Sequence, residues 1–127
     1  MEAIHGYPAV LPGRQECASS LKNVMDALYV IGGKWKLPLI LSLIQSPKRF
    51  NHIQNELQAI SPKVLAKELK DLELNEFIRR IEEPGSPKTI VYHATAHSLS
   101  LKNVLYELGV WGGRHREVIK KSISRPL

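Results

Sequence analysis

Hydrophobic and polar positions separate most clearly between Ser61 and Arg80. Three leucines recur at the i, i+4, i+7 spacing of a buried helix face: Leu65, Leu69 and Leu72. Three lysines repeat that spacing roughly 180° away, at ~100° per residue: Lys63, Lys67 and Lys70. Ser61 is a suitable N-cap, Pro62 suits the first helical position, and Asn75 tolerates the left-handed conformation that ends helices. The pattern predicts a capped helix with a cationic solvent face.

The pattern on either side of this helix predicts three more helices before it and two strands after it. A first helix is expected over 21–31, capped by Ser19 or Ser20, and a second, apolar nearly all round, from Trp35 through Ile44. A third is expected over 52–57 with Asn51 as its cap. Residues 77–83 and 89–94 read as two strands joined by a proline-rich turn, with four inward positions: Phe77, Ile81, Ile90 and Tyr92. The expected fold is mainly α with a small β-hairpin wing, a winged helix-turn-helix.

An apolar stripe marks the last predicted helix, which Thr95 or Ser98 would cap. Its members are Leu101, Val104, Leu105, Leu108 and Trp111. Because the domain already has a core, we expect this stripe to form a homodimer interface, aided by Leu21 and Val24 of the first helix. Packing within its own subunit is the alternative. Gly112 and Gly113 are expected to kink or end the helix.

These elements indicate one domain over residues 17–115, with a flexible arm at 1–16 and a basic tail at 116–127. Eighteen Lys and Arg against 12 Asp and Glu give a formal charge of +6, which favours a polyanionic partner over merely scattered charge once the lysines share a helix face. A single cysteine, no signal-peptide pattern and no apolar run of membrane-spanning length predict a cytoplasmic protein with no membrane partner.

Other chemistry has little support in the sequence. Five histidines without paired cysteines make no metal motif, although His93 and His97 are four residues apart. No phosphate loop, nucleophile elbow or zinc-protease helix is present, so we expect no enzyme, no metal and no cofactor. Trp35 is a candidate for ligand stacking, but core packing is the more common role of a lone tryptophan.

Several motifs occur in a fixed order along the chain: IGGKWK at 31–36, LPLIL at 37–41, PKRF at 47–50, ISPKVL at 60–65, LKDLE at 69–73, and Leu108 with Trp111-Gly112. With these motifs the chain resembles the HxlR-type branch of the MarR-like winged helix regulators of bacteria and archaea. The resemblance covers roughly residues 17–115. It implies a homodimeric transcription regulator whose fourth helix enters the major groove of a pseudo-palindromic operator. It also implies that Ser61, Lys63, Val64 and Lys67 face DNA. The family often has glycine where this chain has Glu76 and Ser98.

Helix-turn-helix proteins place the N-terminal half of the recognition helix against base edges, which suits the same four residues of the fourth helix. Phosphate contacts are expected from Lys48, Arg49, Arg80 and Lys88, and the predicted DNA-binding set also includes Asn51 and Lys70. An adaptor that binds only proteins is the alternative function, but such a surface would be more apolar.

Cys17 is a candidate redox or electrophile sensor. Some relatives in the resembled family carry a sensing cysteine shortly before the first helix, and a helix N-terminus favours the thiolate. An inert packing role is the more common one for a lone cysteine.

Overall fold

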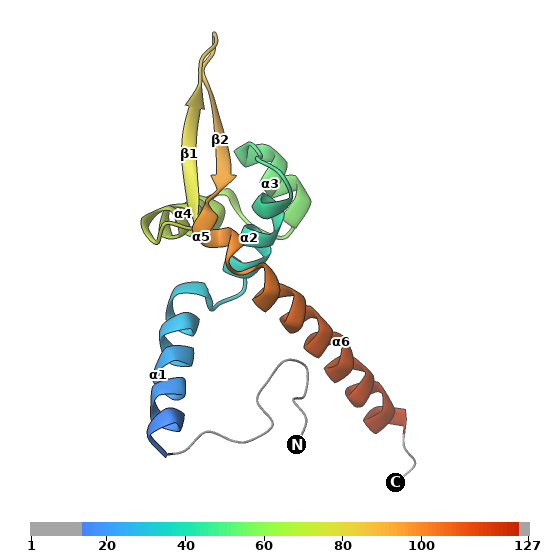
Figure 1. The fold of residues 1–127 in the computed structure, drawn as a ribbon. Coiled ribbons are helices and arrows are strands. Elements are labelled where there is room, and N and C mark those ends of the chain that lie inside the picture. Colours follow the sequence, from blue (N-terminus) through green and yellow to red (C-terminus); the bar gives the residue numbers. More distant parts are fainter. Residues whose placement is uncertain (1–13, 125–127) are drawn as a thin grey trace. The chain divides into compact units, whose positions relative to one another are not determined.

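The computed structural model describes residues 14–124, as six helices and two strands in the order α1 to α4, β1, β2, α5 and α6 (Figure 1). The chain divides into two compact units, residues 1–33 and residues 34–127. The first unit contains α1 (Arg14–Ile31). This helix begins at Arg14 rather than near Leu21, so the expected cap at Ser19 or Ser20 is wrong. Arginine, glutamine, glutamate and alanine before Ser19 favour helix, which explains the earlier start. Most of the expected arm lies outside the described residues.

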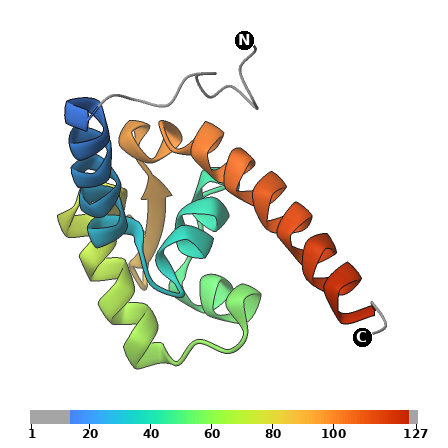
Figure 2. The ribbon, with the colours of Figure 1, turned by 90° about the horizontal axis from the view of Figure 1, so that it is seen from below.

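Helix α2 (Lys36–Gln45) is the centre of the second unit (Figure 2). It contacts α3, α4, α5 and β2, and Leu39, Ile40 and Leu43 are buried along it. Pro38 is accommodated because it lies in the first turn, where the backbone N–H has no intrahelical acceptor. Trp35 is the half-buried N-cap residue, and the Lys34 ammonium lies 4.8 Å from the centre of its ring.

Helices α3 (Phe50–Leu57) and α4 (Pro62–Leu74) form the predicted helix-turn-helix pair. The Ser61 side chain accepts a hydrogen bond from the Val64 N–H at 3.2 Å, which confirms the predicted cap. The predicted leucine face is also confirmed, since Leu65, Leu69 and Leu72 are buried. The cap predicted for α3 is wrong: Arg49 is the N-cap residue and makes no side-chain cap bond, while Asn51 already lies inside the helix.

The end of α4 differs in detail from the prediction. Asn75 is the C-cap residue, but its φ is −92°, and the left-handed residue is Glu76 with φ of 65°. The Asn75 side chain instead donates to the Asp71 carbonyl at 3.0 Å. Glu76 is the position where the resembled family often has glycine, and a positive φ gives the physical reason for that preference.

Strands β1 (Ile78–Glu83) and β2 (Thr89–Ala94) form the predicted antiparallel hairpin, with Ile78 opposite Ala94 and Glu83 opposite Thr89. Lys48 extends the sheet by one residue, since its backbone pairs with that of Tyr92. Phe77 and Ile78 at the base of the hairpin and Val91 in the middle of β2 are buried. The rest of β2 is half-buried, whereas β1 beyond Ile78 is exposed. The predicted inward position at Ile81 is wrong, because this side chain is 40% exposed.

The last predicted helix is split into α5 (Ala96–Leu99), which Thr95 caps, and α6 (Lys102–Ser124). No residue of α6 is buried. The helix passes through Gly112 and Gly113 to Ser124, so the predicted kink or end at these glycines is wrong. Glycine weakens a helix interior by only about 0.5–1 kcal/mol relative to alanine, which the flanking helix formers offset.

Within residues 14–124, no single helix is long and apolar enough to cross a membrane. Ser19–Ile31 and Lys36–Gln45 pass that test only as a bent pair, by length and composition. A buried core helix gives the same signal, and α2 is such a helix.

Candidate DNA interface

The solvent side of α4 carries the predicted cationic face, which we define as Lys63, Lys67 and Lys70. All three are exposed, and the Lys67 side chain is 71% exposed. Val64 is 38% exposed between two of these lysines, although the next residue, Leu65, is completely buried. The Ser61 hydroxyl accepts the cap bond and keeps its own hydrogen to donate. The first half of α4 therefore presents two lysines, a hydroxyl and a branched apolar side chain to solvent.

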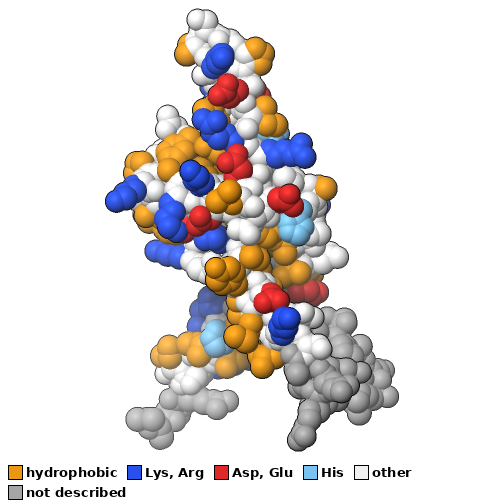
Figure 3. All heavy atoms as spheres, turned by 90° about the vertical axis from the view of Figure 1, so that its left-hand side faces the viewer, with side chains coloured by type: hydrophobic (Ala, Val, Ile, Leu, Met, Phe, Trp, Pro, Cys, Tyr) orange, Lys and Arg blue, Asp and Glu red, His pale blue; other side chains and the backbone are white. Residues whose placement is uncertain are grey.

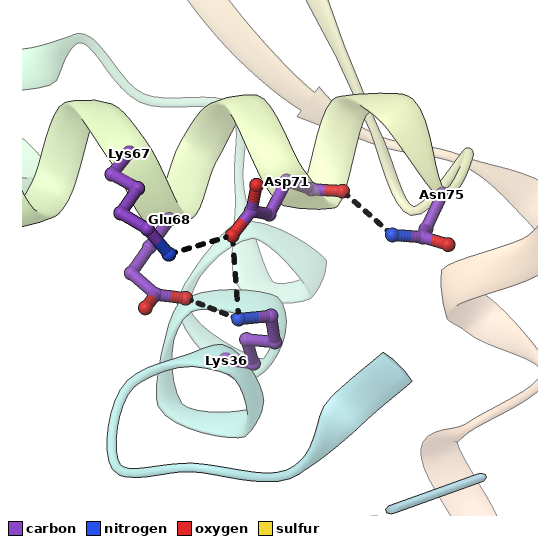
Figure 4. A network of polar contacts seen from close by, with 5 residues as sticks. All are labelled: Lys36, Lys67, Glu68, Asp71 and Asn75. Atoms are coloured by element: carbon purple, nitrogen blue, oxygen red, sulfur yellow. Dashed lines mark hydrogen bonds and ion pairs between the residues drawn. The ribbon is translucent and has the colours of Figure 1, made fainter. Parts of the chain in front are cut away.

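Two carboxylates lie next to this cationic face, and both are partnered. Glu68 Oε2 is 2.6 Å from the Lys36 ammonium of α2. Asp71 Oδ2 is 3.2 Å from Lys67 Nζ and 3.7 Å from Lys36 Nζ (Figure 4). The hydrogen bond to Asp71 raises the pKa of Lys67, so this exposed ammonium is charged at neutral pH. Among the described residues, Lys63 and Lys70 make no ion pair.

The hairpin adds a second set of positive charges. Arg79, Arg80 and Lys88 are exposed, and Arg80 lies 4.0 Å from Glu82, which is a weak contact. Figure 3 shows Lys and Arg side chains gathered at the level of α4 and again along the hairpin above it, with a few carboxylates between them. This distribution supplies positive charge from two elements that follow one another in the chain.

The predicted phosphate contact of Lys48 is wrong, because this side chain is buried. Its side chain is 6% exposed, and its ammonium donates to the Ser42 carbonyl at 2.8 Å and to the Ser42 hydroxyl at 2.9 Å. Glu56 Oε2 of α3 is 2.9 Å from the same ammonium, and the hydrogen bond from Lys48 lowers the pKa of Glu56. Because these partners satisfy the buried charge, Lys48 joins α2, α3 and β2 inside the domain and is removed from the DNA-contacting set.

Most of the other predicted site residues are exposed. Arg49, the N-cap residue of α3, and Asn51, in the first turn of α3, are exposed. The predicted dimer residues Val104, Leu108 and Trp111 are 49%, 49% and 62% exposed, while Leu101 and Leu105 are half-buried. On α1, Leu21 and Val24 are exposed as well. Trp111 stacks on His115, with ring centroids 5.0 Å apart.

Cys17 lies inside α1, in its first turn, rather than before the first helix as predicted. Its backbone position is still near a helix N-terminus. Within the described residues, no group of three or more His, Cys, Asp or Glu side chains is placed to hold a metal ion.

Sequence reasoning missed Lys36 as a member of the site. It contacts α4 from the first residue of α2, and its partner Glu68 is 32 residues away in the chain. A lysine beside a tryptophan in a helix start gives no local signal of such a contact, so only the packing of α2 against α4 reveals it.

A helix pair with an exposed lysine face on its second helix, followed by a basic two-stranded hairpin, defines a winged helix-turn-helix protein. The chain belongs to the HxlR-like helix-turn-helix family, whose profile matches residues 30–120. It is 34% identical to the HTH-type transcriptional regulator YodB of Bacillus subtilis over 92 residues, which are 72% of this chain and 82% of YodB. It is 33% identical to an HTH-type regulator of Halalkalibacterium halodurans over 107 residues, 80% of this chain and 95% of that one.

Solved structures give the same result. The redox regulator HypR in its reduced form matches with a TM-score of 0.73 and 29% identity, over 78% of this chain and 98% of HypR. The reduced form of B. subtilis YodB matches with a TM-score of 0.61 and 31% identity, over 80% and 91%. YodB also matches in diamide-treated and quinone-bound forms. The predicted family and fold class are thus confirmed.

Proposed function

We propose that this protein is a dimeric, sequence-specific DNA-binding transcription regulator. The observation that carries the proposal is the exposed cationic face of α4, which follows a capped N-terminus and lies on the second helix of a helix-turn-helix. In this proposal the DNA bases are contacted by Ser61, Lys63, Val64 and Lys67. The DNA backbone is contacted by Arg49, Asn51, Lys70, Arg80 and Lys88. The cationic rather than apolar surface argues against the adaptor alternative.

Dimerisation follows from the same proposal. In the apolar stripe, Leu101 and Leu105 are only half-buried, and Val104, Leu108 and Trp111 stay 49% to 62% exposed. Leu21 and Val24 of α1 are exposed as well. A second copy of the chain would bury these side chains and place two α4 helices on one duplex. We therefore expect two half-sites about one helical turn, or a multiple of it, apart. The protein would act in the cytoplasm, where its DNA partner lies, and the proposal gives it no enzymatic step.

Selection of duplexes from a randomised pool by the purified protein tests this function. We expect the recovered sequences to share an inverted repeat, because a twofold protein reads two equivalent half-sites. A pool that stays unenriched through successive rounds, or an enriched site without symmetry, would contradict the proposal or its dimeric part, respectively.

The relatives solved in reduced, diamide-treated and quinone-bound forms extend the proposal to a chemical signal, with Cys17 as the reacting group. A thiolate near a helix N-terminus is the nucleophile that such reagents need. We expect diamide or a quinone to release the wild-type protein from its selected duplex and to leave the Cys17→Ser variant bound. Equal release of both proteins would end the assignment of Cys17.

A further inference from the structure

We propose that Lys36 is a positioning residue for DNA recognition, which keeps Glu68 and Asp71 neutralised when Lys67 leaves Asp71 for the DNA. The inference rests on the proposed function, because it concerns the lysine face of α4. It assigns a role to a residue of α2 that lies outside the helix expected to contact the duplex.

The geometry places Lys36 between the two carboxylates. Its side chain is 16% exposed, and its Nζ lies 2.6 Å from Glu68 Oε2, whose side chain is 15% exposed. The same Nζ is 3.7 Å from Asp71 Oδ2, the oxygen that Lys67 also contacts. Figure 4 shows the two ammonium groups approaching Asp71 from different directions, Lys67 along α4 and Lys36 from α2 below it.

Charge counting shows why this arrangement matters for a polyanion. Lys36, Lys67, Glu68 and Asp71 sum to zero in the free protein. If Lys67 turns to DNA, Lys36 still balances one of the two carboxylates and lies within reach of both. Without Lys36, the same movement would leave two negative charges beside the phosphates, and such repulsion acts over several ångströms at a protein surface.

Exposure separates the two lysines into different roles. Because Lys67 is 71% exposed, exchanging Asp71 for another anion costs little free energy. The Lys36 side chain is largely buried and keeps its ion pairs. Before DNA binding, the ion pair with Asp71 thus fixes the orientation of the Lys67 side chain. After Lys67 has moved to the DNA, Lys36 remains as the ion-pair partner of Asp71. This exchange needs both carboxylates to be close to Lys36, as observed.

The test compares full-length variants on a duplex that the wild-type protein has selected from a randomised pool. Lys36→Met removes the central charge, Lys36→Arg retains it, and Lys34→Met removes an equal charge two residues earlier, where the ammonium faces Trp35 instead of a carboxylate. We expect Lys36→Met to bind about tenfold more weakly than Lys34→Met. Lys36→Arg should bind within about threefold of the wild type, and adding Glu68→Gln to Lys36→Met should restore most of the loss, as coupled neighbours do.

A second pair of variants keeps the test decisive if Lys36→Met fails to fold. In the Glu68→Gln variant, Asp71 is the one carboxylate that still pairs with Lys36. This variant should bind DNA more tightly than Glu73→Gln, which removes the same charge from the last turn of α4. The inference is overturned if Lys36→Met binds as well as Lys34→Met, if Glu68→Gln does not relieve the loss, or if Glu68→Gln fails to exceed Glu73→Gln. A wild-type protein that selects no duplex would instead overturn the proposed function, and the inference with it.

Discussion

Replacing Lys67 by glutamate is expected to abolish sequence-specific DNA binding and to leave the fold intact. The Lys67 side chain is 71% exposed, and among residues 14–124 its one hydrogen-bonding partner is Asp71 on the same helix. Surface substitutions of this kind change the free energy of unfolding by about 0.5 kcal/mol or less. The new carboxylate would stand next to Glu68 and Asp71 and turn part of the cationic face negative.

The expected loss of affinity is large because a dimer carries the change twice. A lysine contact to a base edge contributes about 1–3 kcal/mol of discrimination, so two copies correspond to roughly 30-fold to 10⁴-fold in affinity before repulsion is added. Gel shifts on the selected duplex measure the effect. Lys102→Glu is the matched control, since it reverses an exposed charge at the start of α6, and it should bind nearly as well as the wild type. Unchanged affinity of Lys67→Glu would refute the role of α4.

The Leu108→Glu variant is expected to be monomeric. Leu108 is 49% exposed in the middle of the apolar stripe of α6, and no residue of that helix is buried. Burying one leucine side chain contributes about 1.5–3 kcal/mol, and a twofold interface counts it twice. The glutamate would also place an unpaired charge in an apolar interface, so the dissociation constant should rise by at least about a hundredfold.

Sedimentation of the wild type and the variant at one concentration checks this expectation. Tyr106→Glu is the control, because Tyr106 is 70% exposed but lies on the opposite side of α6 from Leu108. The control should remain dimeric and bind DNA, while Leu108→Glu should lose both properties. A dimeric Leu108→Glu protein would show that another surface joins the subunits.

Local signals explain why α4 could be predicted from the sequence. Ser61, Pro62 and the spacing of Leu65, Leu69 and Leu72 all lie within the helix itself, and the structure reproduces the cap and the buried face. The hairpin was predictable for the same reason, because its two β-rich runs flank a proline-rich turn. Such features require no knowledge of distant partners.

Long-range packing explains the errors. Lys48 looked like a surface lysine beside a turn, but its burial depends on Glu56 of α3 and on pairing with Tyr92 of β2. Lys36 meets α4 only after the chain has folded. The continuation of α6 past Gly112 and Gly113 reflects the balance between weak glycine penalties and the helix formers around them, which local rules for breaks overstate.

Binding measured against salt concentration tests most directly whether the cationic face meets a duplex. If a dimer neutralises about eight phosphates, the logarithm of the binding constant should fall with the logarithm of salt at a slope near −7. Lys70→Gln should give a slope shallower by about two, because a dimer would lose one phosphate contact from each subunit. A wild-type slope near zero, or an identical slope for the variant, would contradict this account of α4.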